Sequence, residues 1–150
     1  MLKSIAPFLP PNGLIVKTMS VHSDTFEDAW AIAVIGLHGK IPDGSAGSHF
    51  AEYIKLECVN AMTRLEAKCL ILDFRDVHYR WGNSILGVFE TLDRYFYYEW
   101  HDIGMRMPIK VLTSDKSIGL RSLLPEKNFF ETMESAIQSC SHDMKRWSEE

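Results

Sequence analysis

An unbroken run of apolar residues, Cys69–Leu72, stops at Asp73 and gives way to a polar stretch that extends to Ser84. Such a run is typical of a strand that is buried on both faces of a sheet. Apolar residues then recur at helical spacing, at Ile85, Phe89, Leu92 and Phe96. Ligands and partners of open α/β sheets meet the loops at the carboxyl ends of strands. The polar stretch 73–84 is therefore the first place to look for function.

Two apolar segments precede this region and predict two neighbouring strands that pair as a hairpin. They are rich in β-branched residues and span Leu14–Val21 and Trp30–Leu37. Residues 39–48 contain several glycines and serines and predict a loop. Ser48 can cap the helix that follows, whose apolar face is formed by Phe50, Ile54, Ala61 and Leu65.

The second half of the chain continues the alternation of strands and helices. The helix that begins near Ser84 is predicted to run to about Arg94. A strand over 109–113, a short helix over 118–124 and an edge strand at 129–130 follow. A terminal helix is indicated by the apolar face Met133, Ile137, Cys140, Met144 and Trp147.

This order of elements predicts an α/β fold in which helices pack on a mixed sheet of about four to five strands. A length of 150 residues fits a single domain that spans residues 1–150. Residues 1–13 are broken by prolines and predict an irregular amino-terminal segment. They show no cleavage pattern of a secretion signal, so we interpret them as part of the mature chain.

Composition and charge narrow the class of partner. Hydrophobic residues make up 46% of the chain and charged residues 24%, as in ordinary globular domains. The net charge is −4 and no block of lysines or arginines occurs, which argues against a nucleic-acid partner. The longest apolar runs are too short to cross a bilayer, so we predict no membrane partner.

Cysteines and histidines indicate neither a disulfide framework nor a metal site. Cys58, Cys69 and Cys140 are an odd number at wide spacings, each within an apolar pattern. We therefore predict reduced core cysteines in a cytoplasmic protein. The six histidines show no i, i+4 pair and no Cys-x-x-Cys partner, so no metal and no cofactor are predicted.

Four segments together match the pattern of one known family. Residues 33–41 end in a glycine-containing turn, residues 70–79 read LILDFRDVHY, and residues 84–89 open a helix. Residues 108–137 supply a closing strand, a short helix and a phenylalanine-led ending. These segments resemble the STAS domain, the fold of the bacterial anti-sigma-factor antagonists, and the resemblance spans about residues 14–139.

The resemblance implies a regulatory module for signal transduction that works by binding another protein, an anti-sigma factor or a kinase-like regulator. In the antagonists, a serine of an Asp-Ser-Ser loop receives a phosphate from the partner kinase. The corresponding segment here reads WGNS over 81–84, so the acid is missing and the serine is displaced. These two departures count against a phosphorylation site, and the resemblance implies Ser84 as the residue that would receive the phosphate. The alternative is that Asn83 or Ser84 simply caps the helix.

We predict a partner-binding surface from the polar and aromatic residues of this region, because tryptophan and arginine dominate binding hot spots. The predicted surface consists of Asp73, Arg75, His78, Arg80, Trp81, Asn83 and Ser84. The alternative is that Tyr79 and Trp81 pack down over the sheet while His78 and Arg80 are solvated.

Two other classes of function stay open. A small enzyme of the Clp or crotonase type would use the 75–84 loop, with His78 as general base. The loop lacks a double-glycine oxyanion motif and a nucleophile–histidine pair, which favours a binding module over an enzyme. A self-associating structural subunit would use the aromatic run Tyr95–Trp100 as a homodimer contact.

Overall fold

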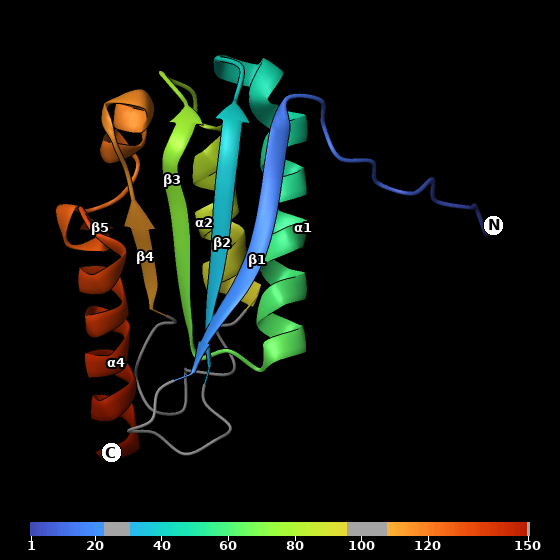
Figure 1. The fold of residues 1–150 in the computed structure, drawn as a ribbon. Coiled ribbons are helices and arrows are strands. Elements are labelled where there is room, and N and C mark those ends of the chain that lie inside the picture. The colour runs from blue at the N-terminus through green and yellow to red at the C-terminus, as the bar shows by residue number, and fades with distance from the viewer. Residues whose placement is uncertain (23–30, 96–107, 150) are drawn as a thin grey trace.

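The computed structural model describes residues 1–22, 31–95 and 108–149. Residues 146–149 are described by their backbone alone. Its single sheet consists of β1 (Leu14–His22), β2 (Ala31–Lys40), β3 (Cys69–His78), β4 (Ile109–Leu112) and β5 (Phe129–Phe130). The strands lie side by side in chain order; β1 is antiparallel to β2, and the other pairs are parallel (Figure 1). The predicted mixed α/β sheet is confirmed, with five strands in the described residues.

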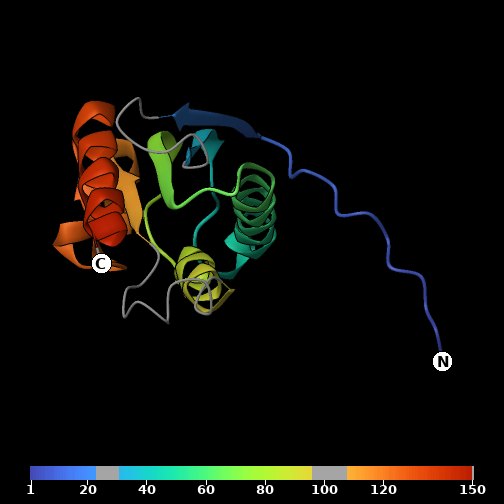
Figure 2. The same ribbon diagram turned by 90° about the horizontal axis from the view of Figure 1, so that it is seen from below.

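Helices cover both faces of this sheet. On one face lie α1 (Ser48–Leu65) and α2 (Ser84–Tyr95), and on the other lies α4 (Met133–Glu149) (Figure 2). The connections contain the 3-10 helices η1 (Gly44–Gly47), η2 (Asp115–Ser122) and η3 (Glu126–Asn128). The short helix predicted over 118–124 is thus a 3-10 helix that begins and ends earlier than predicted.

Two apolar cores, one on each face, explain the unbroken apolar run at the start of β3. Leu70 and Leu72 belong to the larger core under α1 and α2. Cys69 and Ile71 belong to the smaller core under α4. All four side chains are fully buried. The strand is therefore covered on both faces, as its sequence predicts.

β3 does not end at Asp73, where the apolar run stops, but continues to His78. The pairing register between β2 and β3 shifts after Gly36, which marks a bulge. Beyond this bulge the strand still buries Phe74 and Val77, each 0% exposed. The residues from Asp73 to His78 that we expected in a loop are therefore strand residues.

The prediction of three reduced cysteines is wrong. Cys69 in β3 and Cys140 in α4 form a disulfide across a Cα–Cα distance of 5.9 Å, and only Cys58 has a free thiol. Burial raises the pKa of the Cys58 thiol. The bonded pair is separated by 71 residues, and only the packing of α4 on the sheet brings it together. Because disulfides are rare in the cytosol, the predicted cytoplasmic location loses the support of the cysteines.

In the part of the chain that the structure describes, no helix is both long and apolar enough to span a bilayer. The aromatic run predicted to mediate self-association lies outside the described residues, except for Tyr95, whose side chain is exposed at the end of α2.

Candidate functional site

Three loops meet at the carboxyl end of the parallel strands, at the top of Figure 1: the turn after β2, the loop 79–83 after β3, and η2 after β4. Backbone hydrogen bonds join them. The N–H of Ile41 donates to the carbonyl of His78 at 3.0 Å, and the N–H of Tyr79 donates to the carbonyl of Lys116 at 2.9 Å. Residues from three distant parts of the sequence thus form one surface.

The turn 41–47 packs closely against the loop 79–83 through Gly44. The N–H of Gly44 donates to the carbonyl of Trp81 at 3.2 Å, and a Cβ at Gly44 would lie only 3.0 Å from the indole ring. Gly82 has a φ of +132°, a backbone conformation that residues other than glycine rarely adopt. These two glycines allow the tryptophan-bearing loop to lie on the turn.

Tyr79 forms the buried base of the loop. Its side chain is only 1% exposed, and its hydroxyl donates to the carbonyl of Gly82. Burial raises the pKa of Tyr79. Trp81, by contrast, is 60% exposed. The alternative in which both aromatic side chains pack down over the sheet thus holds for Tyr79 but not for Trp81. Trp81 presents a large apolar surface to solvent.

Arg80 is tied to the neighbouring turn by an ion pair with Asp43. Its terminal guanidinium nitrogen donates to Oδ2 of Asp43, and its Nε lies 3.4 Å from Oδ1. The hydrogen bonds from Arg80 hold the pKa of Asp43 below its ordinary value, and they raise the pKa of Arg80. The arginine side chain is 78% exposed, so the pair orients a guanidinium that a partner can still contact.

Ser84 is the first residue of α2, and its hydroxyl donates to the carbonyl of Gly44 at 3.2 Å. The side chain is half-buried, because this bond joins the start of the helix to the turn 41–47. Asn83 is exposed immediately before the helix, at the position of a cap. The hydroxyl of Ser84 therefore fixes a tertiary contact.

An open hollow of about 720 Å³ lies at this junction. It is lined by Gly44, Ser45, Ser48, Arg80, Trp81, Gly82, Asn83, Ser84, Ser122 and Leu123. The amino-terminal residues of both α1 and α2 are among them, and helix amino termini carry partial positive charge. With the arginine beside them, they favour an acidic group on whatever binds here.

The structure brings four of the seven predicted site residues together here, namely Arg80, Trp81, Asn83 and Ser84. Asp73 and Arg75 instead form an ion pair within β3, with Nε of Arg75 donating to Oδ1 of Asp73 at 2.9 Å. The hydrogen bond to Asp73 raises the pKa of Arg75.

His78 is exposed at the end of β3 and lines neither this hollow nor the second one described below. No group of three or more His, Cys, Asp or Glu side chains that could hold a metal ion occurs in the described ranges.

The turn after β2 contributes residues to this site that the sequence pattern does not single out. Asp43, Gly44 and Ser45 were expected only to form a loop. The signal was present, because β2 runs parallel to β3 and its carboxyl end must lie at the same edge of the sheet.

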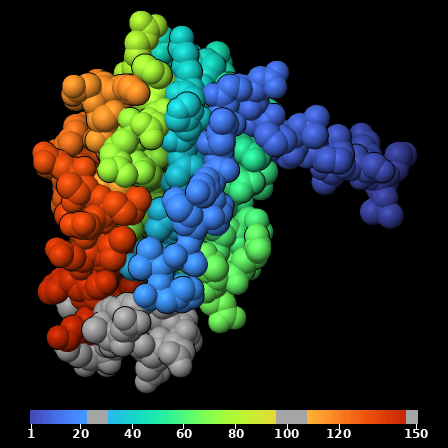
Figure 3. Space-filling view, in the orientation of Figure 1, coloured from blue at the N-terminus to red at the C-terminus, as the bar shows by residue number. Residues whose placement is uncertain are grey.

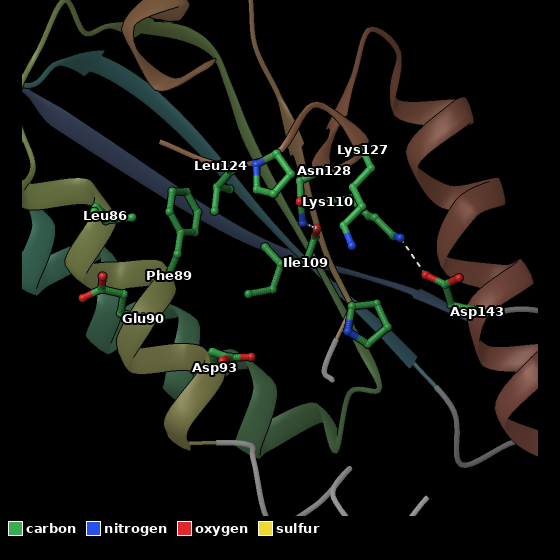
Figure 4. A pocket seen from close by; sticks show the side chains of 12 residues that line it. Leu86, Phe89, Glu90, Asp93, Ile109, Lys110, Leu124, Lys127, Asn128 and Asp143 are labelled. Atoms are coloured by element: carbon green, nitrogen blue, oxygen red, sulfur yellow. Dashed lines mark hydrogen bonds and ion pairs between the residues drawn. The ribbon is translucent and has the colours of Figure 1, made fainter. Parts of the chain in front are cut away.

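A second hollow of about 590 Å³ lies between α2 and the η3 region (Figure 4). Phe89 of α2 and Ile109 of β4 line it, and Asn128 donates a 3.0 Å hydrogen bond to the carbonyl of Ile109. At its far side, Lys110 and Asp143 form a 2.6 Å ion pair between β4 and α4. None of the predicted site residues lines this hollow.

Comparisons with known proteins show what this fold is similar to. No protein-family model matches the chain, and no curated protein matches its sequence. Among solved structures, the fold is similar to that of an anti-sigma factor antagonist from Mycobacterium paratuberculosis, with a TM-score of 0.51 and 14% sequence identity. The match covers 89% of this chain and 99% of that one. The fold of this chain is therefore that of an anti-sigma factor antagonist, as the STAS resemblance predicts.

Proposed function

We propose that this chain is a regulatory protein-binding module that resembles an anti-sigma factor antagonist. Its contact surface, here called the loop surface, consists of Asp43, Arg80, Trp81, Asn83, Ser84 and Ile118. The main support for this proposal is the exposure of two large apolar side chains, Trp81 at 60% and Ile118 at 58%. Both lie on loops that are held together by backbone hydrogen bonds. Large exposed apolar side chains on a fixed backbone are typical of interaction sites.

The loop surface is preorganised for binding, which lowers the entropic cost of association. The Ser84–Gly44 hydrogen bond and the ion pair between Arg80 and Asp43 both join the loop 79–83 to the turn after β2. η2 is joined to the same loop, because Gly119 packs on the backbone of Arg80. A partner would meet a surface whose backbone is already in place.

The partner that fits this surface is a protein with an apolar patch and an acidic group, the patch for Trp81 and Ile118 and the acid for Arg80. An anti-sigma factor or a kinase-like regulator is the partner class that the fold favours. The name of the solved antagonist refers to an anti-sigma factor, and the transfer of that partner class to this chain is part of the proposal.

Phosphorylation of Ser84 would regulate this contact. The Ser84 hydroxyl would have to leave the carbonyl of Gly44, and a phosphate would add about −1.5 to −2 charge near the carboxylate of Asp43. The amino terminus of α2 would partly stabilise the phosphate. The modification would therefore separate the loop 79–83 from the turn after β2 and change the surface a partner meets.

The experiment for the loop surface compares three baits in native cell lysate: the wild type, Trp81→Ala and Leu56→Ala. Leu56 is an exposed apolar residue of α1, 44% exposed, and serves as the matched control. Proteins found by mass spectrometry are then purified and titrated. We expect Trp81→Ala to weaken binding by about 2 kcal/mol or more, as at hot spots. A partner that binds Trp81→Ala and the wild type equally would contradict the proposed surface.

The experiment for the switch uses Ser84→Asp and Ser84→Ala with the same purified partner, together with mass spectrometry of phosphate on the native protein. Phosphate at Ser84, with binding lost only in Ser84→Asp, is the expected result. A partner indifferent to both substitutions would leave a binding module without this switch.

A further inference from the structure

The long open edge of the sheet is β1. It pairs with β2 on one side only, and among the described residues nothing pairs with its outer edge. The opposite edge of the sheet is β5, which has only two residues, whereas β1 has nine. A long edge strand offers a row of unpaired backbone N–H and C=O groups to another chain.

β1 carries few of the usual devices that protect an edge strand. It contains no proline, its only lysine or arginine is Lys17, and its pairing with β2 runs without a register shift. Most of its residues are exposed, including Ile15 at 67% and Met19 at 39%. In Figure 3, β1 lies at the surface of the molecule. Such a strand is expected to associate unless something covers it.

The amino-terminal arm, residues 1–10, does not cover this edge. It leaves the start of β1 and extends away from the sheet (Figures 1 and 2). Phe8 stacks on His49 and lies near Tyr53, with ring centroids 4.8 Å and 6.5 Å apart. Both residues belong to α1, so the arm is directed toward the helix and leaves the strand edge accessible.

The sequence of β1 is complementary to itself when two copies lie antiparallel. Thr18 is the central residue of Leu14–His22, so only a register centred on Thr18 pairs all nine positions. In that register Ile15 faces Val21 of the second copy, and Lys17 faces Met19 of the second copy. Successive residues of a strand point to opposite faces of the sheet. Even-numbered residues at the start of β1 pack against the core under α1, so these four odd-numbered side chains lie on the face that carries α4.

Other registers are worse for identifiable reasons. A register centred on Lys17 places two lysines directly opposite each other, which is destabilising. A register centred on Met19 leaves Ile15 beyond the end of the partner strand. We therefore infer that two copies of this chain pair through their β1 edges, antiparallel and centred on Thr18. The five strands described in each copy would then form one continuous sheet.

The inference does not depend on the proposed function, because the loop surface lies at the carboxyl end of the parallel strands and not along β1. The first test measures association by sedimentation equilibrium over a range of concentrations. The wild type is expected to reach twice its 17.2 kDa mass. A wild type that stays monomeric at the highest soluble concentration overturns the inference.

The register is tested by charge at Met19, which faces Lys17 of the second copy. In the dimer, Met19→Lys places a lysine opposite Lys17 at each of the two equivalent positions. Met19→Glu places a glutamate opposite Lys17 at the same two positions. Both substitutions place a charged residue on the same exposed strand of the monomer. We expect Met19→Lys to raise the dimer Kd at least about tenfold relative to Met19→Glu. Equal dissociation constants for the two variants overturn the register.

Disulfide trapping provides an independent test. Directly opposed residues have Cβ atoms about 4.5–5.5 Å apart, so Thr18→Cys should cross-link with its own copy in mild oxidant. Ser20→Cys is the matched control, because its two sulfurs would be about 13 Å apart at the ordinary rise per residue. Cys58 is buried and does not compete. Cross-linking of Ser20→Cys as fast as Thr18→Cys overturns the inference.

Discussion

At the scale of single residues, the loop surface depends on close backbone contacts that only glycine allows. A Cβ added at Gly119 would lie 2.1 Å from the carbonyl oxygen of Arg80. Backbone atoms cannot move aside as a flexible side chain can, so this contact fixes where η2 meets the loop 79–83. Gly87 of α2 differs, since a Cβ there would meet no atom within 4 Å.

These two glycines predict opposite effects of the same substitution. Gly119→Ala should destabilise the protein by about 1–3 kcal/mol, because the loops must separate to accept the methyl group. Gly87→Ala should stabilise it by about 0.5–1 kcal/mol, because alanine favours a helix over glycine. Urea unfolding of both variants measures the difference. A Gly119→Ala variant as stable as the wild type would show that the loops do not touch there.

The ion pair between Asp43 and Arg80 predicts a pH dependence. Arg80 holds the pKa of Asp43 below its ordinary value of 3.8, so the pair stabilises the fold above that pH. The stabilisation is lost as the pH falls through the depressed pKa. Because the pair is solvent-exposed, its contribution is small.

NMR titration of the Asp43 carboxyl group measures this effect directly. In Arg80→Ala the pKa of Asp43 should return toward its ordinary value, since the hydrogen-bond donor is gone. Arg80→Ala should be slightly less stable than the wild type at neutral pH and equally stable in strong acid. An unchanged pKa in the variant would contradict the pairing.

At the scale of elements, α4 is held to the sheet by two different bonds. The disulfide joins it to the start of β3, and the ion pair between Lys110 and Asp143 joins it to β4. The helix also buries Ala136 and Met144 in the smaller core. Because the disulfide closes a long segment of chain, it restricts the unfolded state strongly.

Removing the disulfide should therefore lower the free energy of unfolding by about 2–4 kcal/mol. The variant is Cys69→Ala with Cys140→Ala, and urea unfolding measures the loss. Reducing agent should destabilise the wild type similarly and leave the double variant unchanged. Thiol titration of the unreduced, denatured wild type should find one reactive group, Cys58. Three reactive thiols would show that the bond is absent.

At the scale of the whole molecule, burial is distributed unevenly across the sheet. β3 lies between the two cores, with most of its residues buried, whereas β1 is exposed along most of its length. Local opening should therefore expose β1 long before β3.

Hydrogen exchange followed by mass spectrometry tests this difference at concentrations where the chain is monomeric. Amides of β3 should exchange slowest, through global unfolding, and those of β1 much faster. At high concentration, exchange in β1 should slow if its edge is paired. Equal protection of the two strands in the monomer would contradict the distribution of burial.

Several features of this protein follow from the sequence alone. Local periodicity predicts the alternation of strands and helices, because side chains on one face repeat every two residues in a strand and about every 3.6 in a helix. The unbroken apolar run of β3 likewise predicts a strand buried on both faces. The helical positions Ile85, Phe89 and Leu92 are buried as that period predicts. The position after a buried strand is also enough to predict four residues of the site, namely Arg80, Trp81, Asn83 and Ser84.

Only the tertiary structure decided the features that depend on contacts between distant segments. The bulge that extends β3 past Asp73 arises from its register against β2. The pairing of Arg80 with Asp43, and of Cys69 with Cys140, depends on which strand ends and faces lie together. Local periodicity shows which residues are buried but not which other segment buries them. That relation is set by the packing of the whole chain.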